Sequence, residues 1–321
     1  MIDFRYHLVS LIAVFLALAI GIVVGTTALN GYVLDDLRAR NGAVIKDKRG
    51  LETEVRDLRN QVSKRDQFAT VVGPAAVAGA LAGERVLLVT TPGASDDVVR
   101  DLTTLITQAG GTPTGVLKIR EDLLDPAKIA VVDDLAARVA PAGLTLPEGE
   151  PADRAAVELA AASVTAPGTD GLSADAAAKV LGGFSGADLV DITPPAGSKS
   201  ATTLIPATLA IMVTGGSDGR GVDEVGKQRQ RVALALLTAL DARSDGAVLV
   251  GPETAAADGG LVAALRDDGS MSRSVSSVDT VDSPYGAVSA VLALREQAAG
   301  GAGRYGQGSG AQAAAPTVTT Q

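Results

Sequence analysis

A single uncharged stretch near the start of the chain constrains this protein more than any other feature of its sequence. No Asp, Glu, Lys or Arg occurs from Leu8 to Leu34, and residues 8–29 are apolar almost throughout. As an α-helix, residues 8–29 would extend about 33 Å, enough to cross a hydrocarbon core of about 30 Å. A cleaved signal peptide has a shorter apolar region of about 7–15 residues and a clear cleavage site. The stretch therefore predicts a retained membrane anchor over residues 1–34.

The charges on either side of this stretch bear on its orientation. Arg5 and His7 precede it, whereas Asp35 and Asp36 follow it directly, before a series of Lys and Arg residues. A count of Lys and Arg alone would place the C-terminal side in the cytoplasm, but long domains cross a membrane largely regardless of flanking charge. The acidic flank leads us to expect the C-terminal domain outside the cytoplasm.

Composition narrows the functions open to the rest of the chain. The 321 residues carry a formal net charge of -9, no cysteine and a single histidine, His7. An acidic chain is poorly suited to a nucleic-acid surface, which needs clustered Lys and Arg. Without cysteine or a second histidine, the usual nucleophile, general base and metal ligands are missing. Only His7 and the methionines Met1, Met212 and Met271 could offer soft ligands to copper. We therefore expect no enzyme activity, no cofactor and no resident metal site.

Two patterns predict self-association. Gly21 and Gly25 form a G-x-x-x-G pair, which lets two membrane helices approach closely, although glycine is also simply common in such helices. Residues 35–68 then carry a seven-residue apolar repeat amid alternating charges, which is typical of a coiled coil. The repeat consists of Leu37, Val44, Leu51 and Leu58, with Val55 and Val62 at the second heptad position.

Polar residues interrupt the second heptad position. Asn41 and Lys48 stand there, where a polar side chain weakens the seam but fixes register and oligomer state. The alternative is one long amphipathic helix that packs on its own domain. The strict repeat favours a homo-oligomer.

Residues 83–298 alternate apolar runs with helical segments, after a Gly/Ala/Pro-rich linker over residues 69–82. This alternation predicts an α/β domain in which a mostly parallel sheet carries helices on both faces. Buried strands are predicted at 85–91, 115–120, 187–192, 208–213, 247–250 and 274–281, and helices at 95–109, 126–139, 151–182 with a break near Pro167, 223–242, 253–265 and 283–296. The Gly/Ala-rich residues 299–321 predict a disordered tail.

Ligands of such sheets bind beyond the carboxyl ends of the strands, so the loops there matter most. The loop from Thr214 to Gly221 is glycine-rich and precedes a helix, which makes it a candidate for binding an anion; the alternative is a flexible loop. Its candidate residues are Gly215, Gly216, Ser217, Gly219 and Arg220. No phosphate-binding G-x-x-x-x-G-K-[ST] or G-x-G-x-x-G fingerprint occurs. Ser95 and Ser283 fit helix caps better than nucleophiles, because no histidine is available to activate them.

The first 25 residues, MIDFRYHLVSLIAVFLALAIGIVVG, resemble the opening of the actinobacterial copper transport protein family called MctB. The heptads, the strand and loop at 85–93 and the closing helix SPYGAVSAVLAL at 283–294 are similar too. The resemblance implies a cell-envelope protein of copper efflux and copper homeostasis, described as pore-forming and placed in the outer membrane, with copper as the transported ion. The family carries no catalytic or metal-ligand motif that could be transferred residue by residue.

Two functional hypotheses follow from the sequence. The first is the envelope protein of copper efflux that the resemblance implies. The alternative is a membrane-tethered coiled-coil scaffold or interaction protein, whose α/β domain binds a ligand or an envelope protein partner. The residues themselves do not suggest a pore: an outer-membrane barrel needs alternating strands of about 9–11 residues, whereas this chain has continuous apolar strands between helices.

Overall fold

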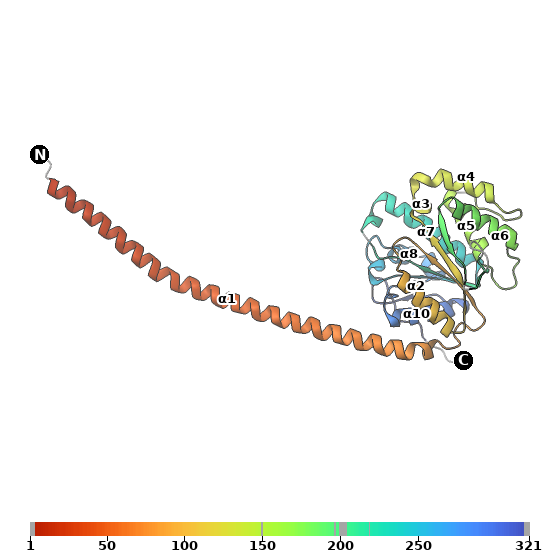
Figure 1. The fold of residues 1–321 in the computed structure, drawn as a ribbon, viewed down its shortest axis with the longest axis horizontal. Helices are drawn as coiled ribbons and strands as arrows, with labels where there is room; N and C mark the ends of the chain where they lie inside the picture. The colour runs from red at the N-terminus through yellow and green to blue at the C-terminus, as the bar shows by residue number, and fades with distance from the viewer. Residues whose placement is uncertain (1–3, 149, 196, 199–203, 218, 318–321) are drawn as a thin grey trace. The chain divides into compact units, whose positions relative to one another are not determined.

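The computed structural model describes residues 4–317, except for 149, 196, 199–203 and 218. These residues fall into two compact units, residues 1–65 and residues 66–321, which we describe separately. A single helix, α1 (Phe4–Val77), makes up the described part of the first unit and enters the second (Figure 1).

The apolar stretch predicted to be an anchor is helical. The candidate span Phe4–Thr26 of α1 contains an 18-residue window with a mean hydropathy of 2.9, none of which is buried. This is the one helix in the described part of the chain that is long and apolar enough to cross a membrane. The heptad region follows in the same helix, and neither Gly42 nor Gly50 interrupts it. We predicted a linker over residues 69–82, but α1 continues to Val77 and contains Pro74.

The second unit is built on a mostly parallel seven-stranded sheet, as the alternating pattern predicts. The strand order is β3-β2-β1-β4-β5-β6-β7, and only the β2–β3 pair is antiparallel. The strands are β1 (Arg85–Thr90), β2 (Thr112–Ile119), β3 (Val190–Thr193), β4 (Leu209–Val213), β5 (Ala247–Val250), β6 (Ser276–Val278) and β7 (Arg304–Tyr305).

Helices cover both faces of the sheet (Figure 1). One face carries α2 (Asp96–Gln108), α10 (Pro284–Ala298) and the end of α1. The other face carries α4 (Ile129–Val139), α5 (Pro151–Ser163), α6 (Ala174–Gly186), α7 (Glu224–Arg243) and α8 (Leu261–Asp267). Short elements complete the fold: α3 (Glu121–Leu124), α9 (Met271–Ser274) and the 3-10 turns η1 (Pro126–Lys128), η2 (Arg220–Val222) and η3 (Glu253–Ala256).

The central strands are apolar without interruption because they face two hydrophobic cores. In β1, Leu87 and Val89 pack into the core under α5 and α7, whereas Val86 and Leu88 pack into the core under α2 and α10. Successive side chains of a strand point to opposite faces, so a strand buried on both sides needs an apolar residue at every position.

Serine caps begin α2 and α10, two of the helices on the face that also carries the end of α1. Ser95 accepts a hydrogen bond from the backbone N–H of Asp97 at the start of α2. Ser283 accepts one from the N–H of Gly286 at the start of α10, where Pro284 follows it. Both serines thus satisfy free N–H groups at helix starts, as predicted.

The strand predicted at 187–192 differs in position and direction. Strand β3 begins at Val190 and runs antiparallel to β2 at the edge of the sheet, with Asp191 exposed. Asp188 reverses the chain just before it with a φ of 56°, a left-handed conformation that Asp tolerates better than most residues. An edge strand has only one neighbour, so a polar residue such as Asp191 is acceptable there.

The helix predicted over residues 253–265 is divided in two. The turn η3 ends at Ala256, and α8 begins only at Leu261. Gly259 adopts a φ of 75°, a conformation that favours glycine. A Cβ atom on Gly260 would lie 2.1 Å from the carbonyl oxygen of Ala255. The two glycines therefore mark a sharp turn rather than the interior of a helix.

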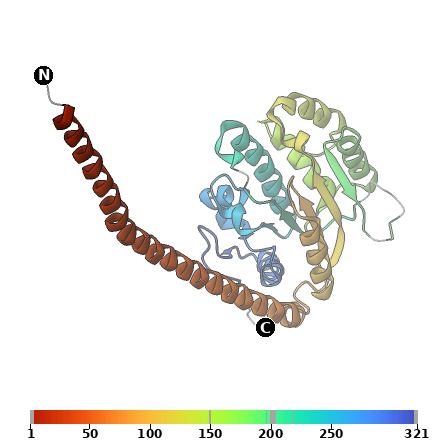
Figure 2. The ribbon, with the colours of Figure 1, turned by 60° about the vertical axis from the view of Figure 1, so that its left-hand side comes forward.

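The residues from 299 to 317 are not a disordered tail, contrary to our prediction. Strand β7 pairs with β6, and the side chain of Tyr305 is buried. The Oη of Tyr305 donates a hydrogen bond to Glu296 of α10 at 2.5 Å. In the turned view of Figure 2 this C-terminal segment, in blue, lies beside α10. The prediction was wrong because it relied on the lack of large apolar side chains, whereas this segment is ordered mainly by hydrogen bonds to its backbone.

A buried ion pair holds that backbone in place. Arg266 of α8 and Asp279, which follows β6, are both buried, with 2.6 Å between Nη1 and Oδ2. The guanidinium also donates to the carbonyl oxygens of Tyr305 at 2.9 Å and Ser309 at 2.7 Å. A charged pair can remain buried only when its other hydrogen-bonding groups are satisfied too.

The carboxylate of Asp279 is satisfied from the same segment. It accepts hydrogen bonds from the backbone N–H groups of Gln307 at 2.7 Å and Gly308 at 3.0 Å. A Cβ atom on Gly306 would lie 1.9 Å from its Oδ1 atom, so only glycine allows the chain to pass so close. The segment 304–309 and the ion pair are therefore one structural unit.

Replacing Arg266 with Met should destabilise the second unit by about 3–5 kcal/mol, because Asp279 would remain buried without its partner. The double variant Arg266→Met/Asp279→Leu should recover part of that loss. Urea unfolding of the full chain in detergent, followed by circular dichroism, measures both. Arg100→Met on the exposed face of α2 is the control and should leave the unfolding midpoint unchanged; equal midpoints for Arg266→Met and wild type would contradict the expectation.

Glu158 of α5 is a second buried ionisable group, but one without a hydrogen-bond partner among the described residues. Its side chain is fully buried, and neither carboxylate oxygen has a hydrogen-bond partner within the described residues. Burial raises the pKa of Glu158 from 4.5 to about 7, against the opposing effect of the nearby charges of Arg154 and Lys179. The folded protein therefore keeps this proton at a pH where the unfolded chain has lost it.

The contribution of Glu158 to stability should fall as pH rises from about 4.5 to about 7, since the folded state binds the additional proton in that window. Glu158→Gln should remove this part of the pH dependence. The melting temperature of the variant should therefore vary less than that of wild type between about pH 5 and about pH 8. Thermal unfolding of the full chain at a series of pH values tests this. Glu150→Gln, at an exposed position beside the start of α5, should keep the wild-type profile.

Candidate functional site

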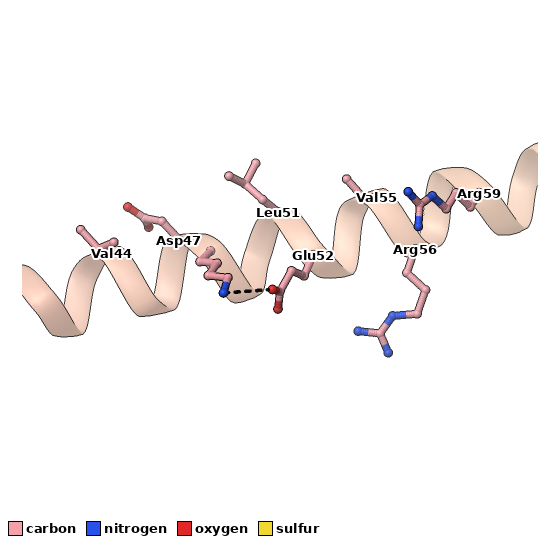
Figure 3. A pocket seen from close by; sticks show the side chains of 8 residues that line it. Val44, Asp47, Leu51, Glu52, Val55, Arg56 and Arg59 are labelled. Carbon is pink, nitrogen blue, oxygen red and sulfur yellow. Dashed lines mark ion pairs between the residues drawn. The ribbon is translucent and has the colours of Figure 1, made fainter.

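The heptad residues predicted for self-association are exposed to solvent on the surface of α1. Figure 3 shows Val44, Leu51 and Val55 on one side of the helix, with Arg56 on the other. The exposed fraction is 62% for Leu51 and 53% for Leu58. We call the apolar heptad residues Leu37, Val44, Leu51, Val55, Leu58 and Val62 the heptad seam; all six are exposed.

Charged residues border the heptad seam, and Lys48 interrupts it at the second heptad position. Lys48 and Glu52, one helical turn apart, form an ion pair at 3.6 Å (Figure 3). Closer to the N-terminus, the surface at Gly21 and Gly25 is open, since a Cβ atom on either would meet nothing within 4 Å. An apolar stripe bordered by charges is suited to packing against another helix. The coiled coil itself stays a prediction.

The second candidate lies at the carboxyl ends of β1 and β4. From β1 the chain adds β2 on one side of the sheet, whereas from β4 it adds β5 on the opposite side. The direction of strand addition therefore reverses between β1 and β4. Open α/β sheets bind ligands in the crevice at such a switch point. A cavity of about 640 Å³ lies there. We call this cavity the switch-point cleft.

The loops after β1 and β4 form one wall of the cleft and touch one another. A Cβ atom on Gly215 would lie 2.6 Å from the carbonyl oxygen of Gly93, so the two backbones are in direct contact. Thr91 donates a buried hydrogen bond of 3.1 Å to the hydroxyl of Thr214. These contacts fix the separation of the two loops.

The predicted anion loop contributes only part of the cleft. Gly215, Gly216 and Ser217 line it. Gly219, the N-cap of η2 with a φ of 77°, does not line the cleft. The side chain of Arg220 lies outside the described part of the structure. Asp223 accepts a hydrogen bond of 2.6 Å from the N–H of Gly226, so a carboxylate of the chain already occupies the start of α7. This makes the helix start a poor place for a phosphate.

The sequence analysis did not identify the polar and charged side chains that α3 and α7 contribute to the cleft. Arg229 and Gln230 come from α7, together with Gly226 and Ala233, and Glu121 comes from α3. The positions 226, 229, 230 and 233 share one face of a helix. The sequence shows this spacing, but it does not show which face of the helix lines the cleft.

Arg229 is the charged residue of the cleft that has a buried donor atom without a hydrogen-bond partner among the described residues. Its Nε atom is buried and makes no hydrogen bond within the described residues. Among those residues, no group of three or more His, Asp or Glu side chains is arranged to hold a metal ion. The cleft can therefore offer a guanidinium, carboxylates and backbone groups to a small molecule.

The two units define a class of protein: an α/β domain with a doubly wound sheet that follows a long N-terminal helix fit for a membrane. A family model described as "Copper transport outer membrane protein, MctB" matches residues 1–316. The chain belongs to this family. Proteins named "Copper transporter MctB" from Mycobacterium tuberculosis (strain ATCC 25618 / H37Rv) and Mycobacterium leprae (strain TN) are both 30% identical to it, each covering 97% of this chain and 98% of the relative.

Placing charges in the heptad seam should dissociate an oligomer that forms through it. In Leu51→Asp/Leu58→Asp, two aspartates would face their counterparts across the interface, where burial of charge is unfavourable. The mass of the full chain in detergent, from sedimentation equilibrium, should fall to that of a monomer or of an assembly held by residues 4–26 alone.

The matched control is Thr53→Asp/Asn60→Asp, which adds the same charge at heptad positions on the outer side of the same helix. It should retain the wild-type mass. Equal masses for both variants and wild type would contradict an interface at the heptad seam.

Proposed function

We propose that this protein is a cell-envelope protein that acts in copper efflux and copper homeostasis, with copper as its substrate. The single observation that carries the proposal is the family match over residues 1–316, which includes the membrane-fit helix, the heptad seam and the α/β domain. The related mycobacterial proteins are named copper transporters over nearly their whole length.

The proposal includes a membrane location and a homo-oligomer. Residues Phe4–Thr26 have the length and hydropathy of a membrane span, and the family description supports the outer membrane. The open surface at Gly21 and Gly25 and the exposed heptad seam would join copies of the chain in parallel. The α/β domain would lie outside the cytoplasm.

A pore, if the protein forms one, requires several copies. One apolar helix cannot enclose a channel, and the strands of the described α/β domain belong to a sheet covered by helices on both faces. The described residues offer no cluster of His, Asp or Glu to hold copper tightly. Transport through this protein would therefore depend on assembly rather than on a resident copper site.

The exposed heptad seam also favours a second function. A membrane-tethered scaffold would use the seam for assembly and the α/β domain for an envelope protein partner or a ligand. This role requires the same oligomer but no effect on copper, so cellular copper separates the two proposals.

The experiment is a measurement of cell-associated copper in a strain that lacks the gene, grown with added copper. We expect copper to accumulate and the wild-type gene to restore the normal level. Unchanged copper in the deletion strain would overturn the efflux proposal and leave the scaffold.

The two heptad variants extend this experiment to assembly. The strain complemented with Leu51→Asp/Leu58→Asp should accumulate copper like the deletion strain, whereas Thr53→Asp/Asn60→Asp should behave like wild type. Immunoblots must show equal amounts of both variants in the membrane fraction. Full restoration by the seam variant would show that copper efflux does not need the heptad seam.

A further inference from the structure

We propose that the switch-point cleft binds a small aliphatic zwitterion, a free amino acid or short peptide that carries both a carboxylate and an ammonium group. This goes beyond copper transport and involves no metal. The cavity volume of about 640 Å³ lies within the range of about 300–1,000 Å³ that is typical of small-molecule sites.

Arg229 would bind the carboxylate of the ligand. Its Nε atom is buried without a hydrogen-bond partner in the described structure, and a buried donor left unsatisfied is unfavourable. The residue lies on the face of α7 that lines the cleft. A planar guanidinium matches a carboxylate with two parallel hydrogen bonds.

The other charges of the cleft exclude a strongly anionic ligand. Glu121 and Asp223 also line it, so the three charged side chains sum to one negative charge. Asp223 already caps the N–H of Gly226 at the start of α7. A nucleotide or polyphosphate would be repelled by these carboxylates, whereas an ammonium group would be attracted to them. A ligand with one charge of each sign complements the cleft best.

Apolar side chains in the cleft define the rest of the ligand. Leu124, Ala233 and Leu261 are buried in its wall, and Val225 lies at its edge with 51% of its surface exposed. These residues suit an aliphatic side chain, since contact with it would remove apolar surface from water. Backbone groups of the glycine loops supply the remaining contacts.

The geometry of the walls suits a small ligand rather than a protein surface. The loops after β1 and β4 are held together by the contact between Gly93 and Gly215 and by the Thr91–Thr214 hydrogen bond. On the opposite wall, a Cβ atom on Gly221 would lie 2.0 Å from the carbonyl oxygen of Gly259. Fixed walls keep the ligand-binding groups in place before binding, which reduces the entropy lost on binding.

Isothermal titration calorimetry of the full chain in detergent tests the proposal with two probes, L-leucine and the dipeptide Leu-Leu. Binding of either probe is expected, and the stronger one identifies whether the ligand is an amino acid or a peptide. Absence of heat with both probes at millimolar concentration would overturn the proposal.

Neutralised probes test the assigned contacts. The amide of the binding probe lacks the carboxylate, and its N-acetyl form lacks the ammonium group, so each should bind wild type about tenfold more weakly or worse. In Arg229→Met the acid and the amide should bind equally weakly. In Glu121→Gln the free and N-acetylated forms should differ less than they do with wild type.

The control variant is Arg138→Met, which removes an exposed arginine of α4 that pairs with Asp134 outside the cleft. It should bind the probe as wild type does. The melting temperature without probe shows whether Arg229→Met is folded, and Arg229→Lys, which keeps the charge, should retain part of the binding. If Arg229→Met still distinguishes the acid from the amide as wild type does, the assignment of Arg229 is wrong.

Discussion

Burial of the central strands on both faces is the constraint on which the α/β domain depends. Leu87 and Val89 of β1 belong to one hydrophobic core, and Val86 and Leu88 belong to the other. Such a strand cannot be covered by one layer of helices, so the chain must supply helices to both sides. The reversal of strand order between β1 and β4 follows from this winding, and it creates the switch-point cleft as a consequence of the fold.

The sequence predicted the elements whose apolar pattern is strong. The membrane-fit helix, the central strands and the helices that begin at Ser95 and Ser283 lie where expected. The edge strand β3 was misplaced because its pattern resembles that of a buried strand, while its direction is set by the turn at Asp188. The helix predicted over 253–265 was too long because the apolar pattern does not show the local turn at Gly259, which brings Gly260 against Ala255.

The candidate sites were predictable to different degrees. The heptad seam repeats along the chain and needs no knowledge of the fold, so its residues could be named in advance. The switch-point cleft joins loops far apart in sequence, and only the glycine loop after β4 gave a signal. Arg229 and Glu121 escaped notice because each is an ordinary charged residue on a helix until the sheet brings α3 and α7 to one cavity.

The clamp between Arg266, Asp279 and the segment 304–309 has a consequence for biosynthesis. Residues 304–309 leave the ribosome after all six other strands of the sheet have been made. Until they arrive, Asp279 lacks two of the N–H groups that satisfy it, and the guanidinium of Arg266 lacks two carbonyl oxygens. A nascent chain would therefore keep this end of the sheet open and would close it only once the segment 304–309 has been made.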